Sequence, residues 1–144
     1  MNLYVESSAI LAWLLDESSA AEVRRLLTDA EVIFTSDLTL IECSRVLIRA
    51  VALGELNEVE AADRRAHLAN AAAGWHVLHI ASEIIDRAKQ PFPEEPIRTL
   101  DALHLASALT ARAAVTPLEI LSLDERVRKS AKKLGFSLLP EKTR

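Results

Sequence analysis

Cysteine is almost absent from this sequence, and long hydrophobic runs are missing altogether. Cys43 is the only cysteine among 144 residues, so no disulfide can form within the chain, which fits a reducing cytosol. No apolar run approaches the roughly 20 residues that a membrane-spanning helix needs. The N-terminal residues 1–6 lack the positive charge and cleavage site of a secretory signal. These absences predict a cytoplasmic protein that does not span a membrane.

The sequence also lacks an excess of positive charge and has few aromatic residues. Its formal net charge is −4 at pH 7, which argues against binding nucleic acid through general electrostatic attraction. Aromatic residues make up 4% of the chain, too few for an extended base-stacking surface. A role with nucleic acid would therefore depend on a local site of acids, metal ions and a few cations. Composition alone favours a small-molecule enzyme or an interaction domain.

The hydrophobic residues follow the pattern of alternating strands and helices. They make up half of the chain, enough for a single domain over residues 1–144 with its own core. Short apolar runs predict buried parallel strands at 3–5, 32–35, 76–80, 120–123 and 137–139. Helical periodicity predicts helices at 7–15, 18–28, 37–53, 55–73, 81–89, 99–113 and 124–134. The alternation predicts an α/β/α sandwich with a mainly parallel central sheet flanked by helices.

Helix ends and one loop are marked by particular residue types. Ser18 and Thr99 are predicted N-caps, because a hydroxyl accepts a hydrogen bond from a free backbone N–H. The glycines Gly54, Gly74 and Gly135 are predicted to end helices. Residues 91–96 hold three prolines and predict a loop inside the domain.

Four carboxylates follow predicted strands or lie near the start of predicted helices. Glu6 follows the first strand, and Glu42 lies early in the helix after the second strand. Asp101 lies in the first turn of the helix that starts near Thr99, and Asp124 follows the fourth strand. Active sites of parallel sheets lie outside the carboxyl ends of the strands. We therefore expect these four acids to meet at one edge of the sheet.

A metal site is the chemical consequence of such a meeting. Converging carboxylates repel one another unless a cation neutralises them. Oxygen ligands alone suit Mg²⁺ or Mn²⁺, and two such ions about 3.5–4 Å apart activate water and stabilise the leaving oxygen of a phosphodiester. The sequence predicts Glu6, Glu42, Asp101 and Asp124 as catalytic residues that hold one or two of these ions.

Each acid also has an ordinary explanation when taken alone. An acid in the first turn of a helix is stabilised by the helix dipole, which explains Asp101 or Asp124 equally well. Glu6 by itself is uninformative, whereas Glu42 lies in the most apolar helix of the chain. The prediction depends on the set of four.

Four segments around these acids resemble the motifs of the PIN-domain family. Residues 3–9, Leu-Tyr-Val-Glu-Ser-Ser-Ala, resemble its start, in which an acid and small hydroxyl residues follow a strand. Residues 36–42 are similar to the second motif, with Glu42 early in a helix. Residues 99–106, Thr-Leu-Asp-Ala-Leu-His-Leu-Ala, resemble the third motif and are the most specific match. Residues 121–124, followed by Ala131 and Gly135, are similar to the fourth, so the resemblance covers nearly the whole chain.

The resemblance implies a PIN-like fold, Mg²⁺ or Mn²⁺, and endoribonuclease activity that leaves a 5′-phosphate and a 3′-hydroxyl. It also implies an RNA substrate and a role as the toxin of a type II toxin–antitoxin pair, with an antitoxin of the VapBC type as partner. The chain departs from the family at Glu6, where aspartate is usual. Two hypotheses follow. In the first, Glu6 still serves as a catalytic metal ligand, with altered metal preference or lower activity. In the second, the chain is a catalytically weakened interaction module.

Several residues near the acids are predicted to assist them. Ser7 and Ser122 are candidates for orienting water or contacting phosphate, with helix capping as the alternative. Arg45 and Arg98 are candidates for binding substrate, and ordinary solvated cations are the alternative. His104, one turn beyond Asp101, is predicted to be packed or hydrogen-bonded rather than a metal ligand.

Two surfaces are predicted outside the acidic site. The helical segments 7–28 and 37–73 are rich in apolar residues, which predicts a groove for an antitoxin segment and a homodimer contact. The residues that suggest this groove are Ile10, Leu11, Trp13, Leu14, Leu15 and Val23. A dense basic cluster flanks Asp124 and is either a solvated helix face or a source of phosphate affinity. Its members are Arg126, Arg128, Lys129, Lys132 and Lys133.

Other functional classes fit less well. A phosphatase or receiver domain would need an Asp-x-Asp sequence after the first strand or a glycine-rich phosphate loop, and the chain has neither. A DNA-directed nuclease with the same four acids stays open at the level of sequence.

Overall fold

A five-stranded parallel sheet lies at the centre of the fold in the computed structural model, which describes residues 1–142. The strands are β1 (Asn2–Val5), β2 (Val32–Ser36), β3 (His76–Leu78), β4 (Glu119–Leu121) and β5 (Ser137–Leu139). Their order across the sheet is β3-β2-β1-β4-β5, and all four pairings are parallel. The predicted strands and the α/β sandwich are therefore confirmed.

The central position of β1 determines where a ligand can bind. The chain adds β2 and β3 on one side of β1 and then returns to add β4 and β5 on the other side. Connections leave in opposite directions from β1 and β4, which opens a crevice beyond their carboxyl ends. Glu6 directly follows β1 at this point.

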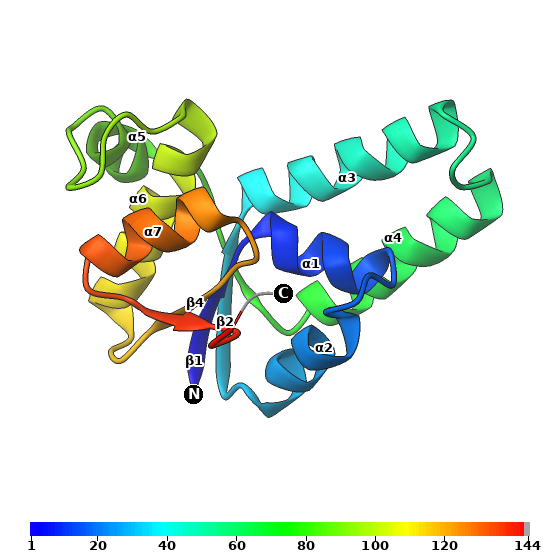
Figure 1. Cartoon of the computed structure of the whole chain (residues 1–144), viewed down its shortest axis with the longest axis horizontal. Helices are drawn as coiled ribbons and strands as arrows, with labels where there is room; N and C mark the ends of the chain where they lie inside the picture. Colours follow the sequence, from blue (N-terminus) through cyan, green and yellow to red (C-terminus); the bar gives the residue numbers. More distant parts are fainter. Residues whose placement is uncertain (143–144) are drawn as a thin grey trace.

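Seven helices within the described residues cover the two faces of the sheet (Figure 1). They are α1 (Ser7–Leu14), α2 (Ala20–Asp29), α3 (Asp37–Ala52), α4 (Glu58–Ala72), α5 (Ser82–Ala88), α6 (Thr99–Ala114) and α7 (Glu125–Lys133). None of the helices in this part of the chain is both long enough and apolar enough to cross a bilayer.

The core is divided into two clusters by the alternation of side chains along the strands. Leu3 and Val5 of β1 pack with residues of α1, α2, α3 and α4, whereas Tyr4 packs on the opposite face with residues of α6 and α7. Successive side chains of a strand point to opposite faces, so a continuous apolar strand is buried on both sides. This explains why Leu3, Tyr4 and Val5 of the central strand are all buried, although they point to alternate faces.

Two predicted helix starts and two predicted N-caps are wrong, because the caps lie elsewhere. Helix α4 begins at Glu58 and not at residue 55, since the Asn57 side chain accepts from Glu60 N (2.8 Å) and the Glu60 carboxylate accepts from Asn57 N (3.0 Å). Helix α2 has Ser19 at its N-cap in place of the predicted Ser18. Thr99 is the first residue of α6, and Arg98 occupies the N-cap position.

Two of the three predicted glycine stops are confirmed by their backbone conformation. Gly54 after α3 and Gly135 after α7 have φ values of 74° and 90°, in the left-handed region that favours glycine. Gly74 follows the C-cap of α4, at Ala73, as predicted, but it does not have a positive φ.

Arg128 corrects the prediction of a basic cluster on α7. Its side chain is buried, with 7% exposed, so it cannot contribute to a phosphate-binding surface. The guanidinium donates to the carbonyl oxygens of Ser122 (2.9 Å), Leu139 (3.2 Å) and Pro140 (2.8 Å). Arg128 therefore ties α7 to the ends of β4 and β5, next to the segment that carries Asp124.

Replacing Arg128 should destabilise the fold more than replacing a neighbouring exposed arginine. Arg128→Met leaves buried carbonyls without a donor, so we expect the free energy of unfolding to fall by about 2 kcal/mol or more. Arg126→Met, on the exposed side of the same helix, should change it by less than about 0.5 kcal/mol. Urea denaturation of both variants measures the difference, and equal stabilities would show that the three carbonyl contacts contribute little.

Candidate active site

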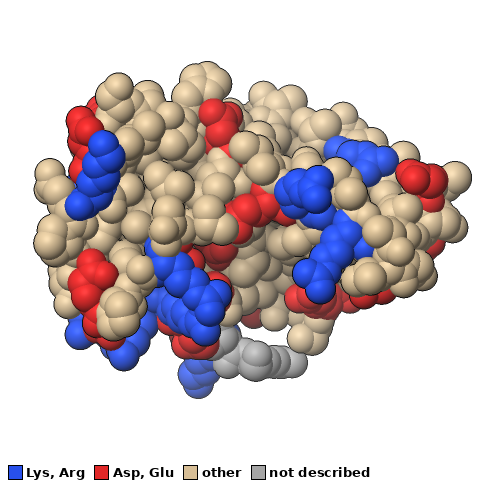
Figure 2. Space-filling model, turned by 90° about the horizontal axis from the view of Figure 1, so that it is seen from above, with Lys and Arg blue, Asp and Glu red and all other residues tan. Residues whose placement is uncertain are grey.

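The predicted acids lie at the carboxyl edge of the sheet. Glu6 follows β1, Asp124 follows β4 after two residues, and Glu42 and Asp101 lie near the starts of α3 and α6. When the molecule is viewed onto this edge, acidic side chains gather near the middle of the face with lysines and arginines beside them (Figure 2).

One pocket brings the four acids together. Glu6, Glu42, Asp101 and Asp124 all line it, as do Ser7 and Arg98. The four acids come from sequence positions as far apart as 6 and 124, and the crevice beside β1 is what joins them. The expectation that they meet at one edge of the sheet is therefore confirmed by the geometry.

Glu6 is the most deeply buried of the four acids, with 4% of the residue exposed. It is the N-cap of α1, and its Oε1 accepts from Ser8 N (3.1 Å). Ser7 Oγ (2.8 Å from Oε1), Ser122 Oγ (2.7 Å from Oε2) and Ser8 Oγ also donate to the carboxylate. A carboxylate has roughly four lone-pair sites, so these four donors satisfy Glu6 completely. The alternative prediction that Ser7 caps the helix is therefore wrong, because Glu6 is the N-cap of α1.

Glu42 is held at one oxygen and open at the other. Its Oε1 lies 2.5 Å from His104 Nε2 and 3.2 Å from Ser7 Oγ. Among the described residues no hydrogen bond reaches Oε2, and 28% of the Glu42 side chain is exposed. Glu42 can therefore offer an oxygen to a ligand without losing its anchors.

Asp101 is the acid with the least compensation. Partial burial raises its pKa above the usual range, and the nearby negative charges of Asp124 and Glu6 add to the shift, while His104 and Arg98 oppose it. No hydrogen bond to the carboxylate is found within residues 1–142. A cation beside Asp101 would favour its charged form, which burial and the neighbouring acids disfavour.

Asp124 is the N-cap of α7. Its Oδ1 accepts from the backbone N–H groups of Arg126 (2.8 Å) and Val127 (3.3 Å), and its own N–H donates to Ser122 Oγ (3.1 Å). The positive end of the helix dipole stabilises the carboxylate. The helix-capping explanation therefore holds for Asp124 and coexists with its place in the pocket.

The donor chemistry of the pocket fits Mg²⁺ or Mn²⁺. All four candidate ligands are carboxylates, and three of them, Glu42, Asp101 and Asp124, have an oxygen to which no described residue donates a hydrogen bond. Over residues 1–142, however, no three His, Cys, Asp or Glu side chains converge closely enough to hold an ion as they stand. The metal ligands therefore stay a prediction, and Glu6 fits that role least well because its lone pairs are already used.

The two predicted arginines have different positions. Arg98 is exposed and lines the acidic pocket, and no ion pair to it is found in the described part of the chain. Arg45 is exposed on α3 and does not line this pocket. Of the basic cluster, Lys129 and Lys133 pair with Glu94, and Arg126 and Lys129 line a pocket that also includes Arg98 and Asp101.

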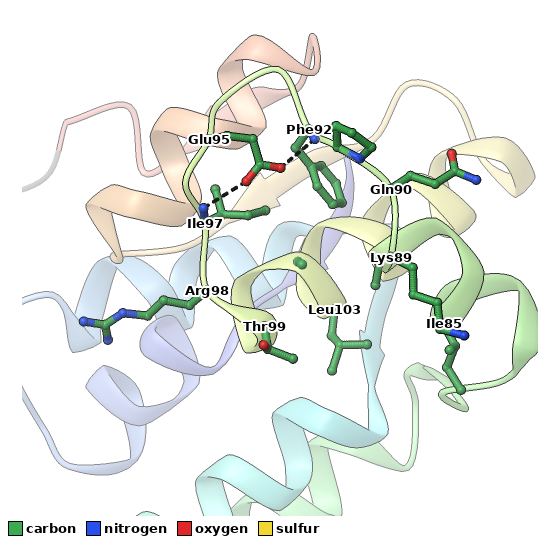
Figure 3. A pocket seen from close by; sticks show the side chains of 12 residues that line it. Ile85, Lys89, Gln90, Phe92, Glu95, Ile97, Arg98, Thr99 and Leu103 are labelled. Carbon is green, nitrogen blue, oxygen red and sulfur yellow. Dashed lines mark hydrogen bonds between the residues drawn. The ribbon is translucent and has the colours of Figure 1, made fainter.

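A second pocket lies beside the acidic one, between α5, the 89–98 segment and α6 (Figure 3). Its walls include Ile85, Phe92 and Leu103, and it shares Arg98 and Thr99 with the acidic pocket. The Arg98 side chain points away from these apolar residues, and the Glu95 carboxylate accepts from Phe92 N (2.8 Å) and Ile97 N (3.0 Å). This segment is the predicted proline-rich loop, and Glu95 fixes its shape.

Two residues of the site carry more contacts than the sequence indicated. Ser8 accepts from Leu123 N (2.8 Å) and donates to Glu6. His104 contacts Glu42, and its Nδ1 lies 3.2 Å from the Tyr4 hydroxyl, whose pKa burial raises to about 12. The spacing of three residues from Asp101 to His104 puts both on one face of α6. This spacing was the feature of the sequence that could have indicated that His104 belongs to the site.

The apolar residues that suggested an antitoxin groove belong mostly to the core. Ile10, Leu14 and Val23 are buried in the cluster that packs under α1 and α2, and Leu11 and Trp13 pack against it. They therefore do not form an excess of surface hydrophobicity. A hollow between α1, α2 and α4 remains, lined by Trp13, Leu14, Asp16, Arg24, Arg64 and His67.

The chain is similar to known proteins over almost its whole length. The family model described as the PIN domain matches residues 3–134. Ribonuclease VapC46 of Mycobacterium tuberculosis is 31% identical over 137 residues, covering 95% of both chains. Ribonuclease VapC47 of the same species is 28% identical over 138 residues, covering 93% of both chains.

Solved structures show the same fold at lower sequence identity. The VapC20 toxin of Mycobacterium tuberculosis, described as cleaving the sarcin-ricin loop, has a TM-score of 0.67 at 16% identity, over 99% of both chains. A toxin–antitoxin complex from Klebsiella pneumoniae has a TM-score of 0.65 at 16% identity, over 100% of both chains. The family model matches residues 3–134, and one relative is 31% identical over almost the whole chain. The chain therefore belongs to the PIN-domain family, and the solved structures agree in fold.

Proposed function

We propose that this protein is a divalent-metal-dependent endoribonuclease that acts as the toxin of a type II toxin–antitoxin pair. The observation that carries this proposal is the single pocket lined by Glu6, Glu42, Asp101 and Asp124 at the crevice beside β1. Family membership supports it, because the relatives of highest identity reported above are named ribonucleases. The proposed metal ligands are therefore inferred from the pocket, and the proposed class of reaction is inferred from the relatives.

Glu42, Asp101 and Asp124 would hold one or two Mg²⁺ or Mn²⁺ ions through their free oxygens. Such ions, when bound, make water a nucleophile at neutral pH and neutralise charge on a phosphodiester. Asp101 is suited to this role because no hydrogen bond from the described residues compensates its charge, and burial and the nearby acids raise its pKa. Glu6 would act at the same site by orienting Ser7, Ser8 and Ser122, whose hydroxyls all contact its carboxylate.

Arg98 would bind the RNA substrate at the rim of the pocket. It is exposed, it lines the acidic pocket, and it brings a positive charge to a site that otherwise repels phosphate. A planar guanidinium donates to phosphate in pairs of hydrogen bonds. Because the net charge of the chain is −4, a local cation of this kind is needed for affinity.

Two partners follow from the same proposal. A cognate antitoxin is supported by the similarity to the Klebsiella pneumoniae toxin–antitoxin complex. A homodimer is supported by exposed apolar side chains on α3, Ile41 and Ile48, which lie two turns apart on one face of the helix. Light scattering of the partner-free protein checks the dimer. The expected cytoplasmic location stays a prediction.

The alternative of a catalytically weakened interaction module is not favoured. It rested on the replacement of aspartate by Glu6, yet Glu6 lies in the pocket with the other three acids. Relatives that are named ribonucleases also argue for catalysis. An interaction module would show no stabilisation by Mn²⁺, which distinguishes the two functions.

Asp101→Asn should abolish metal-dependent cleavage of RNA. Purified parent protein, incubated with total cellular RNA and Mn²⁺ or Mg²⁺, is expected to produce discrete fragments that EDTA prevents. The asparagine variant keeps the shape of the side chain but removes its charge, so we expect a loss of at least about 100-fold in rate. Intact RNA with both proteins, under both metals, would contradict the proposed activity.

The same variant should reveal the cost of burying the Asp101 charge beside other acids, through the pH dependence of stability. The folded protein holds the Asp101 proton to a higher pH than the unfolded chain does, because its pKa is raised. The free energy of unfolding of the metal-free parent therefore falls as pH rises through the interval between the two pKa values. Asp101→Asn lacks this loss, so its stability relative to the parent should increase from acidic to neutral pH in urea titrations. A difference in the free energy of unfolding between variant and parent that does not change with pH would contradict the raised pKa of Asp101.

Glu6→Asp should weaken the fold at this edge of the sheet rather than improve the site. Aspartate is one methylene shorter and cannot reach all the donors that surround Glu6, so we expect about 1 kcal/mol of stability to be lost for each hydrogen bond broken. Thermal unfolding and Mn²⁺ titration of parent and variant test this. Higher Mn²⁺ affinity without loss of stability would instead identify Glu6 as an impaired metal ligand.

A further inference from the structure

His104 is a buried polar residue inside an otherwise apolar helix. It lies on α6 with 2% of the residue exposed, between the buried residues Ala102 and Leu105. Burying an imidazole is costly unless its ring nitrogens are hydrogen-bonded. A leucine would fill the same space without that cost, so the contacts of the ring show what the histidine adds.

Both ring nitrogens of His104 have partners on other elements. Nε2 lies 2.5 Å from Oε1 of Glu42 on α3, and Nδ1 lies 3.2 Å from the hydroxyl of Tyr4 on β1. Tyr4, with 1% exposed, in turn donates to Ser36 Oγ (3.1 Å) at the end of β2. The two rings pack edge to face, with centroids 6.4 Å apart. The orientation of the imidazole is therefore fixed from both sides.

The rigid ring constrains a flexible carboxylate. A glutamate side chain has several rotatable bonds, and Glu42 is partly exposed at the pocket, so it would sample many positions without an anchor. Ser7 provides one contact at 3.2 Å, which it shares with Glu6, whereas His104 provides the shorter one. Both contacts are made by Oε1, which leaves Oε2 available.

We propose that His104 is a positioning residue that fixes the Glu42 carboxylate through Oε1 and presents Oε2 to the metal-binding side of the pocket. The inference rests on the proposed metal-dependent function and adds a residue to it. His104 lies one turn beyond Asp101 on α6, so the same helix carries one acid and sets the position of another. The relative placement of acids from α3 and α6 then depends on this hydrogen bond.

Two polar substitutions separate this role from simple packing. In His104→Gln the amide nitrogen takes the place of Nε2 and can still donate to Glu42. In His104→Asn it takes the place of Nδ1 and reaches only toward Tyr4. Both variants lose the aromatic ring, so their losses of thermal stability should be similar. Only the glutamine variant keeps the donor that faces Glu42.

Mn²⁺ binding is the measurement that decides, with thermal unfolding of the metal-free proteins alongside. We expect the dissociation constant to rise roughly tenfold or more in His104→Asn, since losing a hydrogen bond to a metal-binding residue typically weakens affinity by 10–100-fold. In His104→Gln it should stay within about threefold of the parent. If the two variants bind Mn²⁺ equally well, or lose affinity only in proportion to stability, the positioning role is overturned.

A metal-free measurement keeps this inference separate from the proposed function. Nitrogen–proton NMR correlations of the imidazole should show a proton on Nε2 that is protected from solvent exchange. Glu42→Ala should remove this protection, whereas Asp101→Ala, which deletes another carboxylate of the pocket, should retain it. Protection that survives Glu42→Ala would overturn the inference. If the parent protein fails to bind Mn²⁺ while the NMR result holds, the metal-dependent function fails and the His104–Glu42 contact stands.

Discussion

The hydrogen bonds accepted by Glu6 connect the parts of the chain on which the site depends. The carboxylate lies at the end of β1, caps α1, and accepts a hydrogen bond from Ser122 at the end of β4. A buried charge is tolerated only where donors surround it, and three serines and a backbone N–H do so here. The central strand, its neighbour and the first helix are thereby fixed relative to one another. Arg128 completes the arrangement by tying α7 to the ends of β4 and β5.

The four acids differ in how their charge is compensated. Serine hydroxyls surround the Glu6 carboxylate. Glu42 is anchored by His104 and Ser7, and Asp124 accepts hydrogen bonds from the first turn of α7. Asp101 has no such donor among the described residues, and partial burial, together with the negative charges of Asp124 and Glu6, raises its pKa. Within the described residues, three acids of this site are therefore held by hydrogen bonds and Asp101 is not. Those are the conditions under which a divalent cation gains most from binding, because it replaces repulsion with coordination.

The departure from the family at Glu6 has a structural explanation. The longer side chain allows the carboxylate to reach Ser122 while it still caps α1. Glutamate thus takes a scaffolding role at a position where aspartate is usual. Under the proposed function, residues other than Glu6 would carry more of the ligand chemistry, and the position of Glu42, which contacts His104, would be correspondingly important.

The sequence by itself determined the sheet, the helices and the four acids. Strands buried on both faces are continuous apolar runs, and the acids directly follow strands or begin helices, so local patterns were sufficient. Helix starts were missed where a cap depended on a reciprocal contact, as between Asn57 and Glu60. Only the tertiary structure decided that Arg128 is buried, that Arg45 stays outside the pocket and that His104 contacts Glu42. These outcomes depend on the distance between elements that are far apart in the chain, and periodicity within one helix carries no information about that distance.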